Sequence, residues 1–387
     1  MVVLGVGGAV AAFCMFGGLG SLVKTGPSDP LDAIPKATFI AGTLDFAELR
    51  RSPVYEVIFG KEAPGADPMR RALGVNALAE ACGFDPATRV QRVAVSVPEE
   101  GERGEFGVAA RVEVSRDELE TCTRALADKR GGHAETHDVG SFVVLEDTSA
   151  GAQGGSATRP RLAYGRGGLL VVGKGTWFDA MLGAADRTRP GLRDAPEHMA
   201  LRTSLTSHDG FRAPTLLATA ILPRSLRDRL KGEMGSEAGS QDNSNAIMAG
   251  VLGVSAVGVA IKAGGPGQNV DASVELVCDD AAACEAVDKL AQKKRGEWAR
   301  DLTLRMIGFG QLLDTVEVKR EGARLRVTAS VRADALASTI ERVLKLRARQ
   351  TAADAPPSPR PSLPSMKPST KDTPDETLRA RPDGGAH

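Results

Sequence analysis

Residues 90–97 read VQRVAVSV, and residues 104–114 read GEFGVAARVEV. Apolar residues recur at nearly every second position in both stretches, which is the period of a β-strand with one buried face. The charged segment PEEGER joins them, so we expect two antiparallel strands connected as a hairpin. Ser115 and Glu118 follow at the spacing of a capping box, which predicts that a helix begins there.

The flanking segments extend this pattern. ATFIAGTL (37–44) is predicted to be a strand, and Asp45 to cap a helix that Pro53 bends or divides. Three further strands are expected within 141–147, 159–167 and 169–175, followed by a helix over 176–187. Hairpins without strict strand–helix alternation predict an α+β fold, with helices on one face of an antiparallel sheet.

The same order of elements returns in the second half of the chain. VSAVGVAIK (254–262) and NVDASVELV (269–277) repeat the strand pair, and Cys122 aligns with Cys284 at the offset of 162 that also joins Val112 to Val274. GGLLVVGKGTWFDAMLGAADR (167–187) aligns with GARLRVTASVRADALASTIER (322–342) at an offset of 155. Matches in the same order predict an internal duplication, and hence two tandem α+β units, each with its own antiparallel sheet.

Composition divides the chain into six regions. We expect a membrane anchor or signal-anchor over 1–23, a linker over 24–36 and a first α+β unit over 37–190. A charged connector follows over 191–212, whose His198 and His208 are expected at the surface, and then the second unit over 213–350. The Pro- and Ser-rich tail over 351–387 is expected to be disordered, because it has few apolar side chains to bury.

Two interpretations of the N-terminal stretch MVVLGVGGAVAAF lead to different proteins. A dinucleotide-binding turn would need a third glycine where Val10 stands, and an acidic residue at the end of a second strand. Asp29 and Asp32 lie instead in the turn-like GPSDPLD. Residues 1–23 contain no charge and no proline, and about 20 apolar residues are enough to span a bilayer. We therefore favour an uncleaved anchor, with the bulk of the chain outside the cytoplasm.

The composition and motifs favour no enzyme class. The formal net charge is zero and aromatic residues are 4% of the chain, so we expect no nucleic-acid partner. The stretch GLLVVGKGT lacks the Ser or Thr that must follow the lysine of a phosphate-binding loop. We predict no catalytic residues and no cofactor. His133 and His137, in HAETHD, would share one face of a helix as zinc ligands, but the two preceding glycines favour a solvated turn.

The predicted location outside the cytoplasm bears on whether the cysteines form disulfides. Outside the cytoplasm an even number of cysteines could form disulfides, and four lie beyond the anchor. Cys278 ends a predicted strand and Cys284 lies in the next helix, close enough to bridge the turn. Cys82 and Cys122 could then join two helices of the first unit, although all four could instead be small buried thiols.

The segment GFDPATRVQRVAVSV, followed by GEFGVAARVEVSRDELETC, resembles a group of uncharacterised exported bacterial proteins. In that group an N-terminal anchor precedes a strand and helix, a Gly-x-Asp-Pro turn and a strand pair. The resemblance covers residues 34–190, and more weakly the second half. It implies location and fold, and it supplies no catalytic residues.

These observations predict a non-enzymatic, single-pass envelope protein whose duplicated α+β region binds a protein or a cell-wall component. The alternative is a carrier or sensor of a hydrophobic small ligand held between sheet and helices. A metal-dependent hydrolase using His133 and His137 is the third possibility. The sequence leaves the oligomeric state open.

Overall fold

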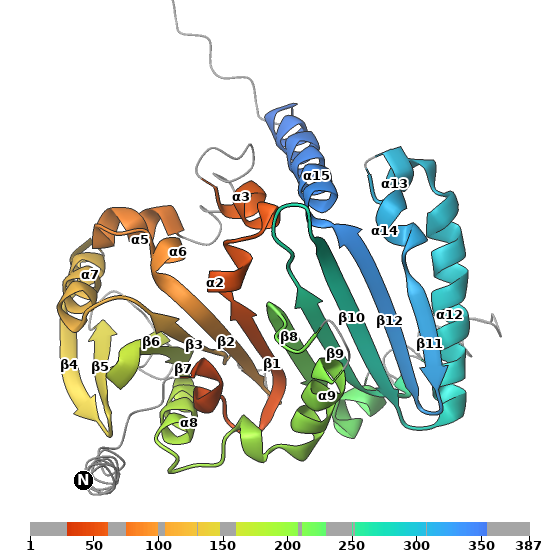
Figure 1. Cartoon of the computed structure of the whole chain (residues 1–387). Coiled ribbons are helices and arrows are strands. Elements are labelled where there is room, and N and C mark those ends of the chain that lie inside the picture. The colour runs from red at the N-terminus through yellow and green to blue at the C-terminus, as the bar shows by residue number, and fades with distance from the viewer. Residues whose placement is uncertain are drawn as a thin grey trace, which may run out of the picture. The chain divides into compact units, whose positions relative to one another are not determined.

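The fold is a single antiparallel sheet with helices on both faces (Figure 1). The computed structural model describes residues 29–60, 75–99, 105–129, 131–147, 160–207, 211–229, 250, 252–306 and 308–353. Its twelve strands lie in the order β11-β12-β10-β9-β8-β1-β2-β3-β7-β6-β5-β4. They are β1 (Thr38–Asp45), β2 (Val90–Pro98), β3 (Gly107–Val112), β4 (Ala134–Val139), β5 (Phe142–Asp147), β6 (Pro160–Gly165), β7 (Leu169–Lys174), β8 (Leu216–Ile221), β9 (Val254–Lys262), β10 (Asn269–Cys278), β11 (Glu317–Glu321) and β12 (Arg324–Arg332).

Helices connect and cover these strands. The longer ones are α5 (Val75–Cys82), α7 (Arg116–Lys129), α8 (Gly175–Ala185), α9 (Pro196–Thr206), α12 (Ala281–Arg300) and α15 (Ala333–Ala353). Shorter helical turns are η1 (Pro30–Ala33), α2 (Phe46–Leu49), α3 (Pro53–Phe59), α6 (Pro86–Arg89), η4 (Arg166–Gly168), η5 (Leu192–Asp194), α13 (Leu302–Met306) and α14 (Gly310–Asp314). Residues 224–229 are also helical.

Local sequence signals set the predicted helix starts. Asp45 accepts a hydrogen bond from the Glu48 amide at 3.0 Å and caps α2, and α3 begins at Pro53 after a break. Ser115 and Glu118 form the predicted capping box. The Glu118 amide donates to Ser115 Oγ at 3.2 Å, and the Ser115 amide donates to Glu118 Oε2 at 2.8 Å.

The sheet has two faces with different coverings. Face A carries Ala41, Ala94, Thr219 and Gly258, and face B carries the alternate residues of the same strands. On face A, α8, η1 and η5 bury one hydrophobic cluster against the sheet and α9 buries a second. On face B, α7 buries a cluster near the β4 edge and α12 buries another near the β11 edge. These two helices therefore lie toward opposite ends of the sheet (Figure 1).

The sequence predicts one sheet in each half of the chain, but the strands of both halves form one continuous sheet. Strand β1 pairs with β2 on one side and with β8 on the other, so the halves are joined by a continuous antiparallel ladder. The prediction of mixed strands and helices with antiparallel pairing is confirmed. The prediction that helices cover only one face is wrong, because both faces carry apolar residues that helices bury, α8 and α9 on face A and α7 and α12 on face B. The prediction of separate sheets is wrong, because β1 and β8 present few charges to solvent and complete each other's backbone hydrogen bonds.

Two segments predicted to be linkers belong to the fold. Residues 30–33 form η1, and Ala33 and Ile34 are completely buried in the cluster under α8. Residues 196–206 form α9, whose Leu201 and Leu205 pack onto face A one helical turn apart. His198, expected at the surface, is buried because it lies on the inner side of this helix.

The remaining terminal predictions fall largely outside the described residues. The anchor over 1–23 and most of the tail over 351–387 lie there, as does His208. Within the described ranges, no helix combines the length and the apolar character needed to cross a bilayer.

Candidate binding face

The predicted metal ligands do not come together. Residues 134–139 form β4 rather than a turn, and His137 is paired with Val144 of β5. Positions four apart in a strand are separated by about 13 Å, so His133 and His137 cannot share one zinc ion as they would on a helix. Among the described residues, no group of three or more His, Cys, Asp or Glu side chains could hold a metal ion.

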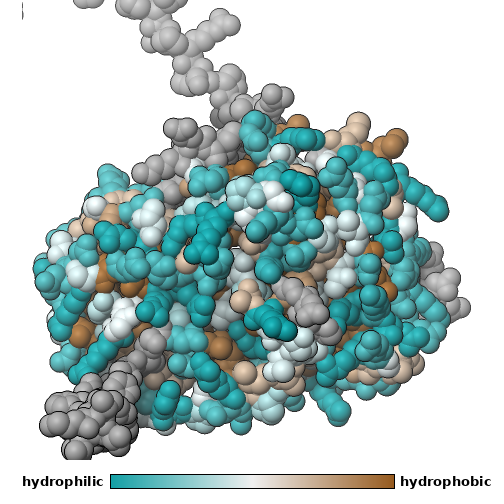
Figure 2. Space-filling view, in the orientation of Figure 1, coloured by the Kyte–Doolittle hydropathy of each residue, from teal (hydrophilic) through white to brown (hydrophobic). Residues whose placement is uncertain are grey.

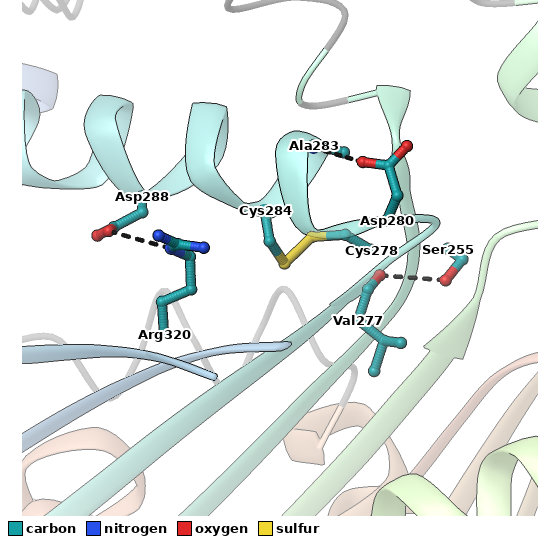
Figure 3. The surroundings of a disulfide bond; sticks show 8 residues. All are labelled: Ser255, Val277, Cys278, Asp280, Ala283, Cys284, Asp288 and Arg320. Carbon is teal, nitrogen blue, oxygen red and sulfur yellow. Dashed lines mark hydrogen bonds and ion pairs between the residues drawn. A yellow bond between two sulfur atoms is a disulfide. The ribbon is translucent and has the colours of Figure 1, made fainter. Parts of the chain in front are cut away.

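The four cysteines form two disulfides, in the pairing that the sequence suggested. Cys82 of α5 is bonded to Cys122 of α7, and Cys278 at the end of β10 is bonded to Cys284 of α12. Figure 3 shows the second bond, with Asp280 capping α12 through the Ala283 amide beside it. Both bonds therefore brace helices that cover face B, and both are consistent with an oxidising compartment outside the cytoplasm.

The two disulfides are expected to stabilise the fold unequally. Their cysteines are separated by 40 and by 6 residues, and loop-closure entropy predicts about 4 and about 2 kcal/mol respectively. Replacing Cys82 and Cys122 by alanine should therefore lower the free energy of unfolding about 2 kcal/mol more than the same change at Cys278 and Cys284. Urea unfolding of both double variants measures this, and equal losses would contradict it.

The strands at the middle of the sheet alternate small and large side chains. In β2 the small Ala94 and Ser96 face α8, and in β9 the small Ala256, Gly258 and Ala260 face α9. A β-carbon on Gly258 would lie 2.6 Å from Leu205 Cδ1. Small residues therefore let the helices of face A approach closely, and the large aliphatic residues of these strands point to face B.

One row of paired residues crosses face B without a polar side chain. The residues directly opposite one another on nine adjacent strands are Val172, Val108, Val95, Gly42, Ala218, Val259, Val274, Val327 and Val318. A β-carbon on Gly42 would meet Val95 Cγ2 at 3.4 Å and Ala218 Cβ at 3.8 Å, and no other side chain of the described residues within 4 Å. Within the described residues, no helix side chain therefore reaches Gly42 at the centre of this row.

We call this region of β2, β1, β8 and β9, which none of the described helices covers, the central apolar face. Ile40 and Val95 are 37% and 42% exposed there, whereas Ala41 and Ala94 beside them on face A are 0% exposed. None of its side chains belongs to the hydrophobic clusters under α7 and α12. It consists of Ile40, Gly42, Leu44, Val95, Val97, Leu216, Ala218, Ala220, Val259 and Ile261.

The central apolar face lies between the two helix-covered ends of face B. Toward β4, Leu119 of α7 covers Ala110 and Val112 of β3. Toward β11, Cys284 and Val287 of α12 cover Leu325 of β12. The side of the molecule shown in Figure 2 is mostly hydrophilic, with small hydrophobic areas between charged ones. On face B, an uncharged part of the sheet thus lies between two helices that disulfides brace.

Face A carries buried polar groups where the two halves meet. His198 Nε2 lies 2.8 Å from the Thr38 carbonyl oxygen, and Nδ1 lies 2.8 Å from Thr219 Oγ1. A carbonyl only accepts, so Nε2 carries the proton and Nδ1 accepts from the threonine. Burial lowers the pKa of His198, as does Arg202, while the Thr38 hydrogen bond opposes them. His198 is therefore a neutral bridge between β1 and β8.

Arg202 lies one turn further along α9 and is also buried. It donates to Thr43 Oγ1 at 3.0 Å and to the Leu217 carbonyl at 3.4 Å, again joining β1 to β8. Burial lowers the pKa of Arg202 to about 10. These contacts join the two halves and leave neither side chain facing the central apolar face.

One cavity is lined mainly by polar and charged side chains. It has a volume of about 390 Å³ and lies at the ends of β1, β2 and β3, lined by Asp29, Pro30, Asp45, Ala47, Gln91, Arg92, Arg111 and Glu113. Burial alone would raise the pKa of Asp45, but hydrogen bonds from the Glu48 amide and Arg92 outweigh it and hold the pKa low. These described residues include no histidine, cysteine or serine, so they offer no paired nucleophile and base.

Sequence reasoning missed the central apolar face. The signal was present in VAVSV and AVGVAI, where small residues alternate with large ones. The small and the large side chains of these strands are all apolar or nearly so, and the face with the large side chains would ordinarily be assigned to the core. The location of α9 was needed to show that the face with the small side chains is the covered one.

No protein-family model matches the chain, and no curated protein matches it. Two solved structures of TP0453, in crystal forms III and I, align with TM-scores of 0.41 and 0.39. They are 12% and 13% identical, and the alignments cover 81% and 82% of this chain and 98% and 97% of those chains. At these scores the similarity assigns no function.

Proposed function

We propose that this protein is a non-enzymatic, single-pass envelope protein that binds a protein or cell-wall component through the central apolar face. The observation that carries the proposal is the uncharged middle row of face B, where Val95 is 42% exposed and no described helix side chain lies within 4 Å of a β-carbon placed on Gly42. Burying such a surface against a partner would release water from it and favour association.

The envelope location is supported by the two disulfides, which persist in oxidising compartments. The anchor over 1–23 remains a proposal from its length and lack of charge. The absence of enzymatic activity is likewise proposed. Turnover of a defined substrate by the purified full chain would refute it.

Position-specific crosslinking in the native envelope tests the binding face. A photoreactive residue at Ile40 should yield one defined adduct, and the same residue at Val139, which is similarly exposed on β4, should not. Adding Val95→Lys should reduce the Ile40 adduct at least about tenfold, because burying the new charge in the contact costs several kcal/mol. The stability of Val95→Lys should stay near that of the native chain, since the site is open. Identical adducts at Ile40 and Val139 would contradict the proposal.

A carrier or sensor of a hydrophobic small ligand is the second candidate. It is favoured by the aliphatic character of the central apolar face, which offers no side-chain hydrogen bonds to a polar ligand. Native mass spectrometry of the full chain distinguishes the ligand carrier from the protein-binding or cell-wall-binding protein. A bound small molecule that Val259→Lys removes would favour the carrier, whereas a crosslinked protein adduct without such a molecule would favour the binding protein.

We also propose that the two halves arose by duplication. The strand order is symmetric about the β1–β8 pair, with β1, β2, β3, β7 and β6 matching β8, β9, β10, β12 and β11. Symmetry of the middle row relates Val172 to Val327, at the offset of 155 expected from sequence. It relates Val274 to Val108 instead of Val112, a shift of four residues. A shift by an even number of residues keeps the same residues on face B. The sequence match therefore identifies β3 as the counterpart of β10, but aligns the two strands four residues away from their structural match.

A further inference from the structure

The three most exposed large apolar side chains among the described residues lie within nine positions of one another. Trp298 near the end of α12 is 52% exposed, and Leu302 and Met306 of α13 are 74% and 75% exposed. Trp298 lies eleven residues after the buried Val287, which is three turns along the same side of the helix. The apolar side of α12 therefore continues beyond the part of the helix that covers the sheet.

Positive charge accompanies these side chains. Residues 293–306 contain five basic and two acidic residues. Lys294 pairs with Glu297, and Arg305 pairs with Asp314. Lys294, and with it Lys293, lowers the pKa of Glu297, whereas Arg295 and Arg300 form no ion pair within 4.0 Å among the described residues. We call Lys293, Arg295, Trp298, Arg300, Leu302 and Met306 the α12–α13 patch.

The neighbouring helix extends the patch. A cavity of about 400 Å³ is lined by Arg305 from α13 and by Thr339 and Arg342 from α15, so the two helices are close to one another. Just beyond it on α15, Val343 and Leu346 are also exposed. In Figure 2 hydrophobic residues reach the surface at the upper right, where Figure 1 places α13.

We infer that the α12–α13 patch docks on the surface of an anionic lipid bilayer. A tryptophan and long aliphatic side chains flanked by Lys and Arg are typical of segments that lie in a membrane interface. The surplus of positive charge complements anionic headgroups, which attract Lys and Arg side chains close to the bilayer surface. The patch is separate from the central apolar face, so this contact does not depend on the proposed function.

Tryptophan fluorescence of the full chain in vesicles tests the docking. The chain has two tryptophans and none in residues 1–28, so the anchor contributes no signal. Trp177 is 7% exposed. The emission of Trp177 alone is measured in the Trp298→Phe variant and subtracted. In vesicles of phosphatidylcholine with about one-third phosphatidylglycerol, Trp298 emission should shift to the blue and be quenched by brominated acyl chains. In phosphatidylcholine alone the quenching should be several-fold weaker.

Charge variants separate docking from mere proximity to the vesicle. Lys293→Glu with Arg300→Glu should reduce the quenching at least about tenfold, and high salt should reduce it in the native chain. Leu302→Glu with Met306→Glu should abolish it, whereas Val139→Glu on β4 should not change it. Equal quenching in both lipids, or none in either, would overturn the inference. So would a blue shift that depends on protein concentration without vesicles, since that would assign the patch to a second copy.

Discussion

Replacing Glu275 by glutamine is expected to lower the free energy of unfolding by about 3 kcal/mol at neutral pH. The Glu275 side chain is 1% exposed on face A beneath α9. Its two carboxylate oxygens lie 2.7 Å from Arg324 Nη1 and 2.7 Å from Arg326 Nη2. The Ser204 hydroxyl of α9 lies 2.9 and 2.8 Å from the same oxygens. Glutamine keeps the shape but leaves the guanidinium of Arg326 without its counter-charge.

The loss should depend on pH with a defined sign. Burial alone would raise the pKa of Glu275, but Arg326, Ser204 and Arg324 outweigh it, so the folded-state pKa lies below the ordinary 4.5. A carboxylate of this kind stabilises the fold above pH 4.5 and loses that contribution as the pH falls through its folded pKa. The difference between native chain and Glu275→Gln should therefore be full at neutral pH and shrink in acid.

Urea unfolding at neutral and acid pH measures both effects. Glu317→Gln is the matched control, because Glu317 pairs with Lys319 at 3.1 Å while both side chains are largely exposed. That pair should contribute less than about 0.5 kcal/mol. A loss for Glu275→Gln no larger than this control, or one that is equal at both pH values, would show that the buried network does not stabilise the fold.

Gly258→Val is expected to lower the free energy of unfolding by about 3 kcal/mol, whereas Gly42→Val should change it by less than about 1 kcal/mol. The two glycines lie in central strands on opposite faces of the sheet. A β-carbon on Gly258 would lie 2.6 Å from Leu205 Cδ1 and 2.9 Å from Leu201 Cγ, which would push α9 off face A. At Gly42 the nearest atoms are at ordinary van der Waals distances.

This pair of variants also tests whether the central apolar face is open. A β-branched residue favours the strand conformation, and at Gly42 its methyl groups can extend into solvent. Thermal unfolding of the two variants and of the native chain gives the comparison. A large loss at Gly42 would mean that something packs over this face, and the proposed binding face would then have to be abandoned.

Short-range signals were sufficient to predict much of the fold. The hairpin of β2 and β3 followed from period-two alternation, and the start of α7 followed from Ser115 and Glu118, because both depend on neighbours in the chain. The break at Pro53 followed from proline geometry in the same way. The two disulfides join the pairs that spacing suggested, since Cys278 and Cys284 flank a single turn.

Long-range arrangement could not be predicted. Residues 191–212 are charged and contain proline, yet Leu201 and Leu205 give α9 one apolar side, which was too short a pattern to distinguish from a connector. Whether β1 and β8 would pair or end separate sheets depends on contacts between residues more than 170 positions apart. The binding face was missed for the same reason, since its definition requires knowing which face α9 covers.

The single ladder from β11 to β4 also bears on aggregation. Among the described strands, β4 and β11 are the two that lack a partner on one side, and both carry charge: β4 contains Glu135 and Asp138, and β11 contains Glu317, Lys319 and Arg320. Charged outer strands discourage pairing with other chains. The strands with almost no charge, β1 and β8, satisfy each other inside the ladder. Separating the two halves at that junction would leave β1 and β8 as unpaired, nearly uncharged edge strands, which are prone to pair with other chains. The pairing of β1 with β8 therefore helps to keep both halves soluble.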